Sequence, residues 1–476
     1  MAQGLLDEEE GRSWSPPVRN LDHFFSNMYQ FFYTKGLPTI VLTQACDVVS
    51  LGFTTVFSAF LIGFVNWHTL VECHDEMTCG PMHNYVHNPF KHFSVTRNFF
   101  VFVYVMILIA YWMWRAIHGY NTITKAFEME AFYREKLGIR ISDLHTMKWD
   151  NVLQKLIHLH DSGMHRVAIQ EKLTEHDVVL RIMRRENYMI ALINKSLLNL
   201  KVPWWVSPFM SEKLFLTKSL EWSLNFCVME YMFNEQFNIS SLFLKDVAGL
   251  EGRFKMVGII HFILLPFMLI FMAVSFFLQN AQQFHSSRAY LGPRQWSSLA
   301  LWTFREFNEL PHVFDERMNK SYAAAVEYTL QFSDANLTVL ARCAAYISGA
   351  FVATLLLISL VAEGALLYVS VSNHNLLWWL GIFSALYAAT RALIPDETKS
   401  TTSPEELMAR VSATTHYFPD HWSQQAHTTK VRDEFVELFP YKITLFGMEL
   451  MSVLLTPIVL CFSLPNSAQA IIHFVR

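Results

Sequence analysis

The chain has 476 residues, of which 52% are hydrophobic, 15% are aromatic and only 16% are charged. Soluble domains usually carry about 25% charged residues, and about 20 apolar residues suffice to cross a bilayer, so this composition with its long apolar runs excludes an ordinary soluble protein. The formal net charge of -4 excludes a strongly basic, nucleic-acid-binding protein.

The first residues, 1–20, are acidic and polar, with a run of four acids at Asp7–Glu10. They lack the basic flank and the apolar core of a signal peptide. We expect a disordered cytoplasmic leader there, followed by a signal anchor that stays in the protein.

Six apolar segments follow the leader, at 40–66, 98–118, 256–279, 338–362, 376–394 and 443–464. Lys and Arg accumulate in short loops on the cytoplasmic side of a membrane. If all six segments crossed, the basic loops 280–337 and 393–442 would face the lumen, and loop 363–375, which has no Lys or Arg, would face the cytosol. Six crossings therefore contradict the charge distribution.

The charge distribution is satisfied if the third and sixth segments enter and leave on the same side. Each contains an interior proline, Pro266 or Pro457, which interrupts the helical hydrogen-bond ladder and predicts the apex of a re-entrant hairpin. We therefore predict an all-α polytopic membrane protein with four transmembrane helices, two re-entrant membrane hairpins and both termini in the cytoplasm.

This topology divides the chain into a series of regions. They are the disordered leader 1–20, the first two spans 21–118 with a lumenal loop 67–97, a cytoplasmic helical region 119–255, a re-entrant hairpin 256–279, cytoplasmic or interfacial helices 280–337, the third and fourth spans 338–394, a cytoplasmic helical segment 395–442, and the second re-entrant hairpin with the C-terminus 443–476.

Two groups of residues have side chains suited to metal or redox chemistry. Cys73 and Cys79 lie in the predicted lumenal loop, where a disulfide, two free thiols and a metal site remain alternatives. In the cytoplasmic region His158, His160 and Asp161 crowd together beside His165, and we interpret these as ordinary surface residues rather than ligands or an acid–base pair. No metal site is predicted.

Ionisable residues inside or near apolar segments are costly, and they tend to face protein or water. Six residues belong to this group: Asp47, His261, Arg342, Glu363, Arg391 and Glu449. Snorkelling to the membrane surface accounts easily for Arg342 and Arg391. It accounts less well for Glu449 and His261, so we expect at least two of the six to line a water-filled cavity.

The segment 295–322 lies between long apolar segments and mixes aromatic residues with charges of both signs. Arg305, Glu306, Glu309 and His312 could line a hydrated groove that replaces water around a zwitterionic headgroup. An interfacial, ion-paired linker is an equally good interpretation of these residues.

Several stretches resemble the autophagy-related protein 9 family. They include Leu21-Asp-His-Phe-Phe25, Arg181-Ile-Met-Arg-Arg-Glu-Asn-Tyr188, Phe304-Arg-Glu-Phe-Asn-Glu-Leu-Pro-His312, Arg391-Ala-Leu-Ile-Pro-Asp-Glu397 and Thr456-Pro-Ile-Val-Leu-Cys-Phe462, and the resemblance covers about 20–475.

The resemblance implies an intertwined homotrimer around a pore. It further implies ATP-independent phospholipid scrambling between the leaflets of Golgi- and endosome-derived vesicles and of the growing phagophore, together with a lipid-transfer protein and other autophagy factors. The family's polar path maps onto Arg305 and Glu306, and a pore-lining role falls on Arg391. Glu449, as an ionisable residue inside an apolar segment, is a second pore-lining candidate. The partners are then phospholipids and other copies of the chain, with no cofactor, no nucleic acid and no covalent chemistry. An ion or solute channel and a structural membrane scaffold are the alternatives.

Overall fold

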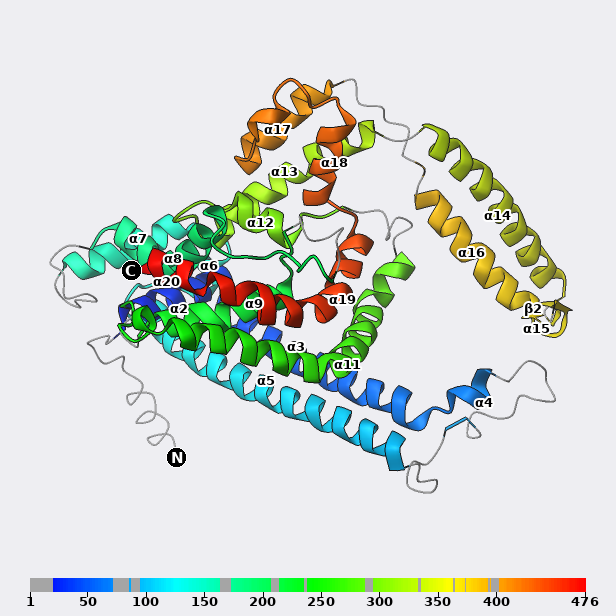
Figure 1. Cartoon of the computed structure of the whole chain (residues 1–476), viewed down its shortest axis with the longest axis horizontal. Coiled ribbons are helices and arrows are strands. Elements are labelled where there is room, and N and C mark those ends of the chain that lie inside the picture. Colours follow the sequence, from blue (N-terminus) through cyan, green and yellow to red (C-terminus); the bar gives the residue numbers. More distant parts are fainter. Residues whose placement is uncertain are drawn as a thin grey trace.

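The computed structural model describes residues 20–71, 85–86, 95–162, 173–206, 214–234, 238–286, 294–332, 335–362, 364–372, 374–392, 394 and 402–476 (Figure 1). These residues are mostly helical, as predicted, and strands are limited to a two-residue pair. Their buried apolar side chains gather in three separate clusters.

The first two apolar segments form a long helical pair. Helix α3 (Leu37–Ala59) continues into a π-helical turn η1 (Phe60–Phe64), followed by the short α4 (Trp67–Val71). Helix α5 (Val95–Glu135) packs along α3 and continues past residue 118, where the second span was predicted to end. The indole of Trp112 donates to the carbonyl of Val48 at 2.9 Å, and Arg115 pairs with Asp47 at 2.7 Å. Asp47 therefore lies in an ion pair between the two helices.

The polar end of α5 forms a helical domain with α2 (Leu21–Tyr33), α6 (Ile141–Leu144), α7 (Trp149–Asp161) and α8 (Glu175–Asn194). Helix α2 begins where the Asn20 side chain accepts the N–H of His23, and its apolar face is buried in this cluster. The buried carboxylate of Asp22 pairs with Arg181 at 2.8 Å and Arg184 at 2.7 Å, which joins α2 to α8.

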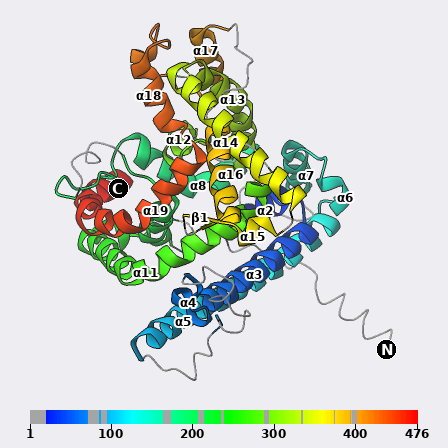
Figure 2. The same ribbon diagram turned by 90° about the vertical axis from the view of Figure 1, so that its right-hand side faces the viewer.

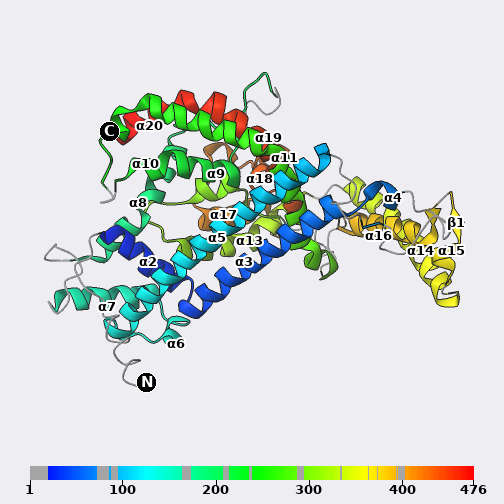
Figure 3. The same cartoon turned by 90° about the horizontal axis from the view of Figure 1, so that it is seen from below.

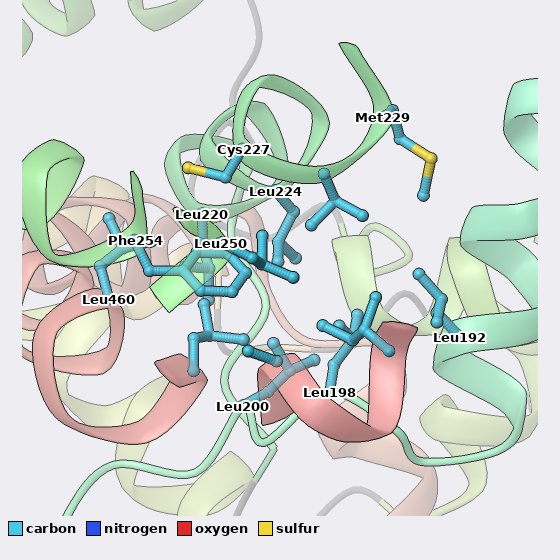
Figure 4. Close-up of a cluster of buried hydrophobic side chains, with 14 of the residues drawn as sticks. Leu192, Leu198, Leu200, Leu220, Leu224, Cys227, Met229, Leu250, Phe254 and Leu460 are labelled. Atoms are coloured by element: carbon cyan, nitrogen blue, oxygen red, sulfur yellow. The ribbon is translucent and has the colours of Figure 1, made fainter. Parts of the chain in front are cut away.

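A second cluster surrounds α11 (Val247–Ser286). It includes the helices α9 (Lys218–Leu224), α10 (Glu230–Met232) and α20 (Ala468–Val475), together with a π-helical turn η3 (Asn225–Met229) and a 3₁₀ turn η4 (Phe243–Lys245). Figure 4 shows Leu198 and Leu200 from the segment between α8 and α9 pointing into the same core as Leu250, Phe254 and Leu460.

Helix α19 (Lys442–Ile458) lies beside α11, and its continuation through η6 (Val459–Ser463), η7 (Leu464–Ser467) and α20 also contacts α11 (Figure 3). The rings of Phe276 and Phe446 stack at one end of this pair. At the other end Gly258 permits close approach, because an added Cβ would lie 2.5 Å from Cys461 Sγ. The two helices therefore run antiparallel.

The prolines of this pair do not break the chain's helical course. Pro266 lies inside the continuous helix α11, which Figure 1 shows bent rather than folded back on itself. Pro457 lies near the end of α19, and helical turns follow it to α20. The predicted non-helical apex at Pro266 is therefore wrong, because the neighbouring turns stay helical and the helix bends instead.

A third cluster contains α12 (Ser298–Phe304), α13 (Pro311–Gln331), α17 (Pro404–Thr415), the 3₁₀ turn η5 (Asp420–Trp422) and α18 (Thr429–Leu438). Figure 2 shows α13, α17 and α18 at one end of the molecule. Two regions predicted separately, 280–337 and 395–442, thus share one core in their described parts.

The remaining helices, α14 (Ala335–Val361) and α16 (Leu376–Ala392), form a hairpin that stands apart from the other helices (Figure 1). Its tip carries α15 (Ala365–Tyr368) and the antiparallel strands β1 (Ser370–Val371) and β2 (His374–Asn375), with Val371 opposite His374. The two helices pack on each other, but most of their apolar surface is exposed.

Five described helical stretches are long and apolar enough to cross a membrane, and they begin within α3, α5, α11, α14 and α19. They coincide with five of the six predicted apolar segments. The remaining segment, 376–394, is α16, which at 17 residues is slightly shorter than a typical span and packs against α14.

Candidate functional site: a cavity lined by charges of both signs

A cavity of about 630 Å³ lies where α2, α8, α9, α12 and α13 meet. Its apolar lining includes Trp302 and Phe314. Its charged lining residues comprise three cations and three anions, which are Arg185, Lys218, Arg305, Glu186, Glu221 and Asp315. The cavity therefore offers nearly balanced charge beside an apolar wall.

Arg305 is the residue of the predicted groove that lines this cavity. It follows directly after α12, where the backbone turns to an extended conformation, and its guanidinium pairs with Glu186 of α8. The guanidinium also lies over the rings of Trp302 and Phe314, at 5.4 and 5.0 Å from their centroids. These contacts hold a cation at the cavity wall.

The carboxyl of Glu186 is less favourable as an anion than its pairing suggests. Burial raises its pKa, the nearby charge of Glu221 raises it further, and Arg305 opposes both effects. Pairing with Arg305 therefore offsets only part of the cost of burying the charged carboxylate.

The loop between α12 and α13 is fixed to α8. Asn308 adopts a left-handed conformation with φ of 59°, which asparagine tolerates better than most residues. Its backbone N–H donates to Asn187 Oδ1 at 2.9 Å, and Asn187 Nδ2 donates to Asn308 Oδ1 at 2.8 Å. This amide pair holds the chain just beyond Arg305 in place.

Glu306 points away from the cavity. Its side chain is 52% exposed, and a carboxylate oxygen lies 2.6 Å from Nδ1 of His416, which follows α17. It is not a lining residue. The structure therefore separates Arg305 and Glu306, which the sequence had placed together in one groove.

Glu309 has a structural partner instead of a place on the cavity wall. Its two oxygens accept from Nε and Nη2 of Arg317, both at 2.7 Å, and the pair is almost fully buried, with 8% of Glu309 and 11% of Arg317 exposed. Arg317 also donates to the carbonyls of Phe304 at 2.7 Å and Thr414 at 2.8 Å. This clamp joins α12, α13 and α17 and holds the residue before Arg305.

His312 lies behind the cavity wall, bonded to Tyr29, which lines it. The backbone N–H of His312 donates to the Tyr29 hydroxyl at 3.1 Å, and that hydroxyl lies 2.9 Å from His312 Nδ1. Burial lowers the pKa of His312 and raises that of Tyr29, so both groups are neutral near pH 7. The hydroxyl proton is then available to Nδ1, which favours the imidazole proton on Nε2.

Glu449, predicted to line a pore, joins the membrane helix α19 to the cavity. Its carboxylate accepts the backbone N–H of Lys218 at 3.2 Å, at the start of α9, and the hydroxyls of Thr217 and Ser452 lie 2.7 Å apart beside it. Lys218 and Glu221 of α9 line the cavity. Thus one wall of the cavity is fixed directly to α19.

The other predicted residues lie elsewhere. Arg391 is exposed at the end of α16, where its Nη1 lies 3.5 Å from the carbonyl of Ile394. His261 is buried in α11 near the ring of Trp222. Arg342 lies on α14, and Glu363 falls outside the described residues.

The potential metal and redox ligands gain no further support. Cys73, Cys79 and His165 lie outside the described residues. Among the residues that the structure describes, no group of His, Cys, Asp and Glu could hold a metal ion. His160 is buried rather than on the surface, which corrects that prediction, because it lies on the inner side of the amphipathic helix α7.

Sequence reasoning missed the wall contributed by α8 and α9. Arg185 and Glu186 belong to a charged stretch that the sequence showed clearly, but its helix carries no apolar span and lies far from segment 295–322 in the chain. A helical projection of α8 would have placed Met183 on the buried face of the helix and its charged neighbours at the edge of this face.

Comparisons with known proteins agree with one another. A family model described as "Autophagy protein ATG9" matches residues 13–476. Autophagy-related protein 9 of Dictyostelium discoideum is 34% identical over 465 residues, covering 96% of this chain and 64% of that protein. The protein of the same name from Aspergillus clavatus is 33% identical over 492 residues, covering 99% of this chain and 50% of that protein.

A solved structure is also similar. The cryo-EM structure of Schizosaccharomyces pombe Atg9 matches with a TM-score of 0.68 and 30% identity, and the match covers 96% of this chain and 94% of that one. The chain spans between half and about two thirds of the length of the two curated relatives named above.

Proposed function

The chain belongs to the autophagy-related protein 9 family, and from this premise we propose that it is an ATP-independent phospholipid scramblase of autophagic membranes. Its substrates are phospholipids, which it moves between the leaflets of Golgi- and endosome-derived vesicles and of the phagophore. It works as a homotrimer with both termini in the cytoplasm, and an autophagy lipid-transfer protein supplies or removes the lipid.

The observation that carries this proposal is the balanced charge of the cavity, which lies beside the membrane helix α19. A zwitterionic headgroup in hydrocarbon loses its hydration, and its charges must be paired to limit that cost. In the cavity the phosphate would pair with Arg305, Arg185 or Lys218, and the amine with Glu221 or Asp315. The acyl chains would stay in contact with the apolar wall and the membrane.

The competition at Arg305 gives this path a means of exchange. Burial raises the pKa of Glu186, which eases protonation of this carboxyl, and a protonated Glu186 would release Arg305 to another anion. The phosphodiester of a headgroup carries one negative charge on two non-bridging oxygens, and arginine binds such an anion in a bidentate manner. A headgroup that enters would displace Glu186 and leave when Glu186 returns, which requires no ATP.

Glu449 couples this cavity to the membrane helices. Because it bonds to the start of α9, a shift of α19 would carry Lys218 and Glu221 with it. We propose that α11 and α19, each with an interior proline, enter the cytoplasmic leaflet and return to the same side. The exposed α14–α16 hairpin would then cross the membrane and be covered by other copies of the chain, with Arg391 at the central pore.

Scrambling is tested with the purified chain in liposomes that carry fluorescent lipid in both leaflets. Dithionite added outside bleaches only the outer leaflet of intact liposomes, so near-complete bleaching is expected if the chain scrambles. A parallel sample with a fluorophore trapped inside must stay unbleached, because this control excludes entry of dithionite. Bleaching that stops at the outer leaflet would contradict scrambling, and ion flux without lipid movement would indicate a channel.

A further inference from the structure

We propose that Trp204, Trp205 and Phe462 form an interfacial anchor that lies in the headgroup region of a lipid surface. The three rings come from two segments far apart in the chain, yet the rings of Trp205 and Phe462 meet edge to face at 5.3 Å. Their exposed fractions are 74%, 56% and 57%, respectively. Single exposed apolar residues are normal on a protein surface, but adjoining large rings indicate a partner.

The fold imposes this exposure. Leu200 and Val202, which precede the tryptophans, are buried in the core around α11. The hydroxyl of Ser463 donates to the carbonyl of Lys201 at 2.7 Å, and the N–H of Val206 closes a turn by donating to the carbonyl of Pro203 at 3.0 Å. The backbone on both sides of the two tryptophans is therefore fixed, and their side chains are held outward.

The depth of the rings relative to the membrane follows from α11. Its apolar run begins at Met256, directly after Lys255, so Lys255 marks the boundary between the polar and apolar parts of that helix. The thiol of Cys461 lies 3.8 Å from the carbonyl of Lys255. Phe462 is the next residue in the chain and contacts Trp205, so the anchor lies at the level of that boundary.

The chemistry of the patch favours lipid as the partner. Tryptophan combines a large apolar ring with one N–H donor, and it is enriched at membrane–water interfaces for this reason. Exposed lysines at 201 and 255 flank the rings and suit the phosphates of headgroups. Helix α11 also exposes five apolar residues beyond Lys255, which are Met256, Ile259, Ile260, Phe262 and Ile263.

Quenching of tryptophan fluorescence tests the anchor in the full chain reconstituted in liposomes. The lipids carry bromine on the acyl chains close to the headgroup, and bromine quenches only tryptophans within contact range. The double variant Trp204→Phe, Trp205→Phe should show a smaller quenched fraction than the unchanged chain. The matched control Trp422→Phe removes a buried indole from the third cluster and should show a larger quenched fraction.

An unchanged or larger quenched fraction in the double variant would overturn the anchor, whether water or a second copy of the chain covers the rings. A second measurement needs no substitution. Phospholipids with a photoactivatable group near the headgroup should label the peptide containing residues 201–206 in the unchanged protein, and labelling of α11 peptides without this one would overturn the proposal. Neither measurement depends on lipid scrambling, so the anchor and the proposed function can fail separately.

Discussion

Replacing Glu309 with alanine would leave the guanidinium of Arg317 buried without its carboxylate. The pair is almost fully buried, and both oxygens of Glu309 are used. Removing one partner of a buried pair costs about 3–5 kcal/mol, because the remaining charge is uncompensated. We therefore expect Glu309→Ala to destabilise the third cluster by this amount.

The assay is hydrogen exchange of backbone amides in α17, which Arg317 holds through the carbonyl of Thr414. Since 1.36 kcal/mol corresponds to a factor of ten, protection there should fall by a factor of about 10² to 10⁴. Amides in α3 and α5, which belong to a separate helical pair, should exchange at unchanged rates.

The matched double variant Glu309→Leu, Arg317→Met removes both charges together. It still leaves the carbonyls of Phe304 and Thr414 without a donor, at about 1–3 kcal/mol each if they stay dry. The loss of protection in the double variant should nevertheless be smaller than the sum of the losses in the single variants Glu309→Leu and Arg317→Met. A loss of protection of less than tenfold for Glu309→Ala would refute the clamp. Strict additivity of Glu309→Leu and Arg317→Met in the double variant would refute it as well.

Two further substitutions test packing and charge. Gly258→Ala should destabilise the α11–α19 pair by about 1–3 kcal/mol in thermal unfolding, because the added methyl would overlap the turn η6. The control Gly447→Ala adds a methyl to open space and should not destabilise the pair. Equal effects of the two substitutions would contradict the packing described. Hydrogen bonds from Trp422 and His421 lower the pKa of Glu434 in the folded protein below the ordinary glutamate pKa of 4.5. The stabilisation from these bonds is therefore fully present above pH 4.5, and it is lost as the pH falls through the pKa of the folded state. Glu434→Gln should therefore flatten the acid side of the unfolding profile of the third cluster, and a profile of unchanged steepness would show that this carboxyl does not contribute.

Hydropathy predicted the membrane helices well, because the apolar composition that identifies such a helix lies within each segment. Five of the six apolar segments are long apolar helices, and the remaining one, 376–394, is the shorter helix α16. The behaviour of the prolines was harder to predict. Pro266 removes one hydrogen bond from α11, but packing against α19 keeps the neighbouring turns helical, and that packing is not visible in the local sequence.

The candidate site was only partly predictable for a related reason. The segment 295–322 supplies Arg305, but whether a charged residue lines a cavity depends on partners distant in the chain. Glu309 could not be recognised as a buried partner of Arg317 until α13 and α17 were placed together. The opposite wall of the cavity, with Glu186, comes from a helix about 120 residues earlier in the chain.

The central claim is that Arg305, at the cavity wall, binds the phosphate of a passing headgroup. The most direct measurement compares Arg305→Leu with Glu306→Leu in the liposome bleaching assay, because these neighbours differ in whether they line the cavity. A hydrogen bond to a charged group contributes about 1.5–3 kcal/mol, so Arg305→Leu should slow scrambling about tenfold or more, while Glu306→Leu should leave the rate nearly unchanged. Equal rates for the two variants, or a larger loss from Glu306→Leu, would contradict the account.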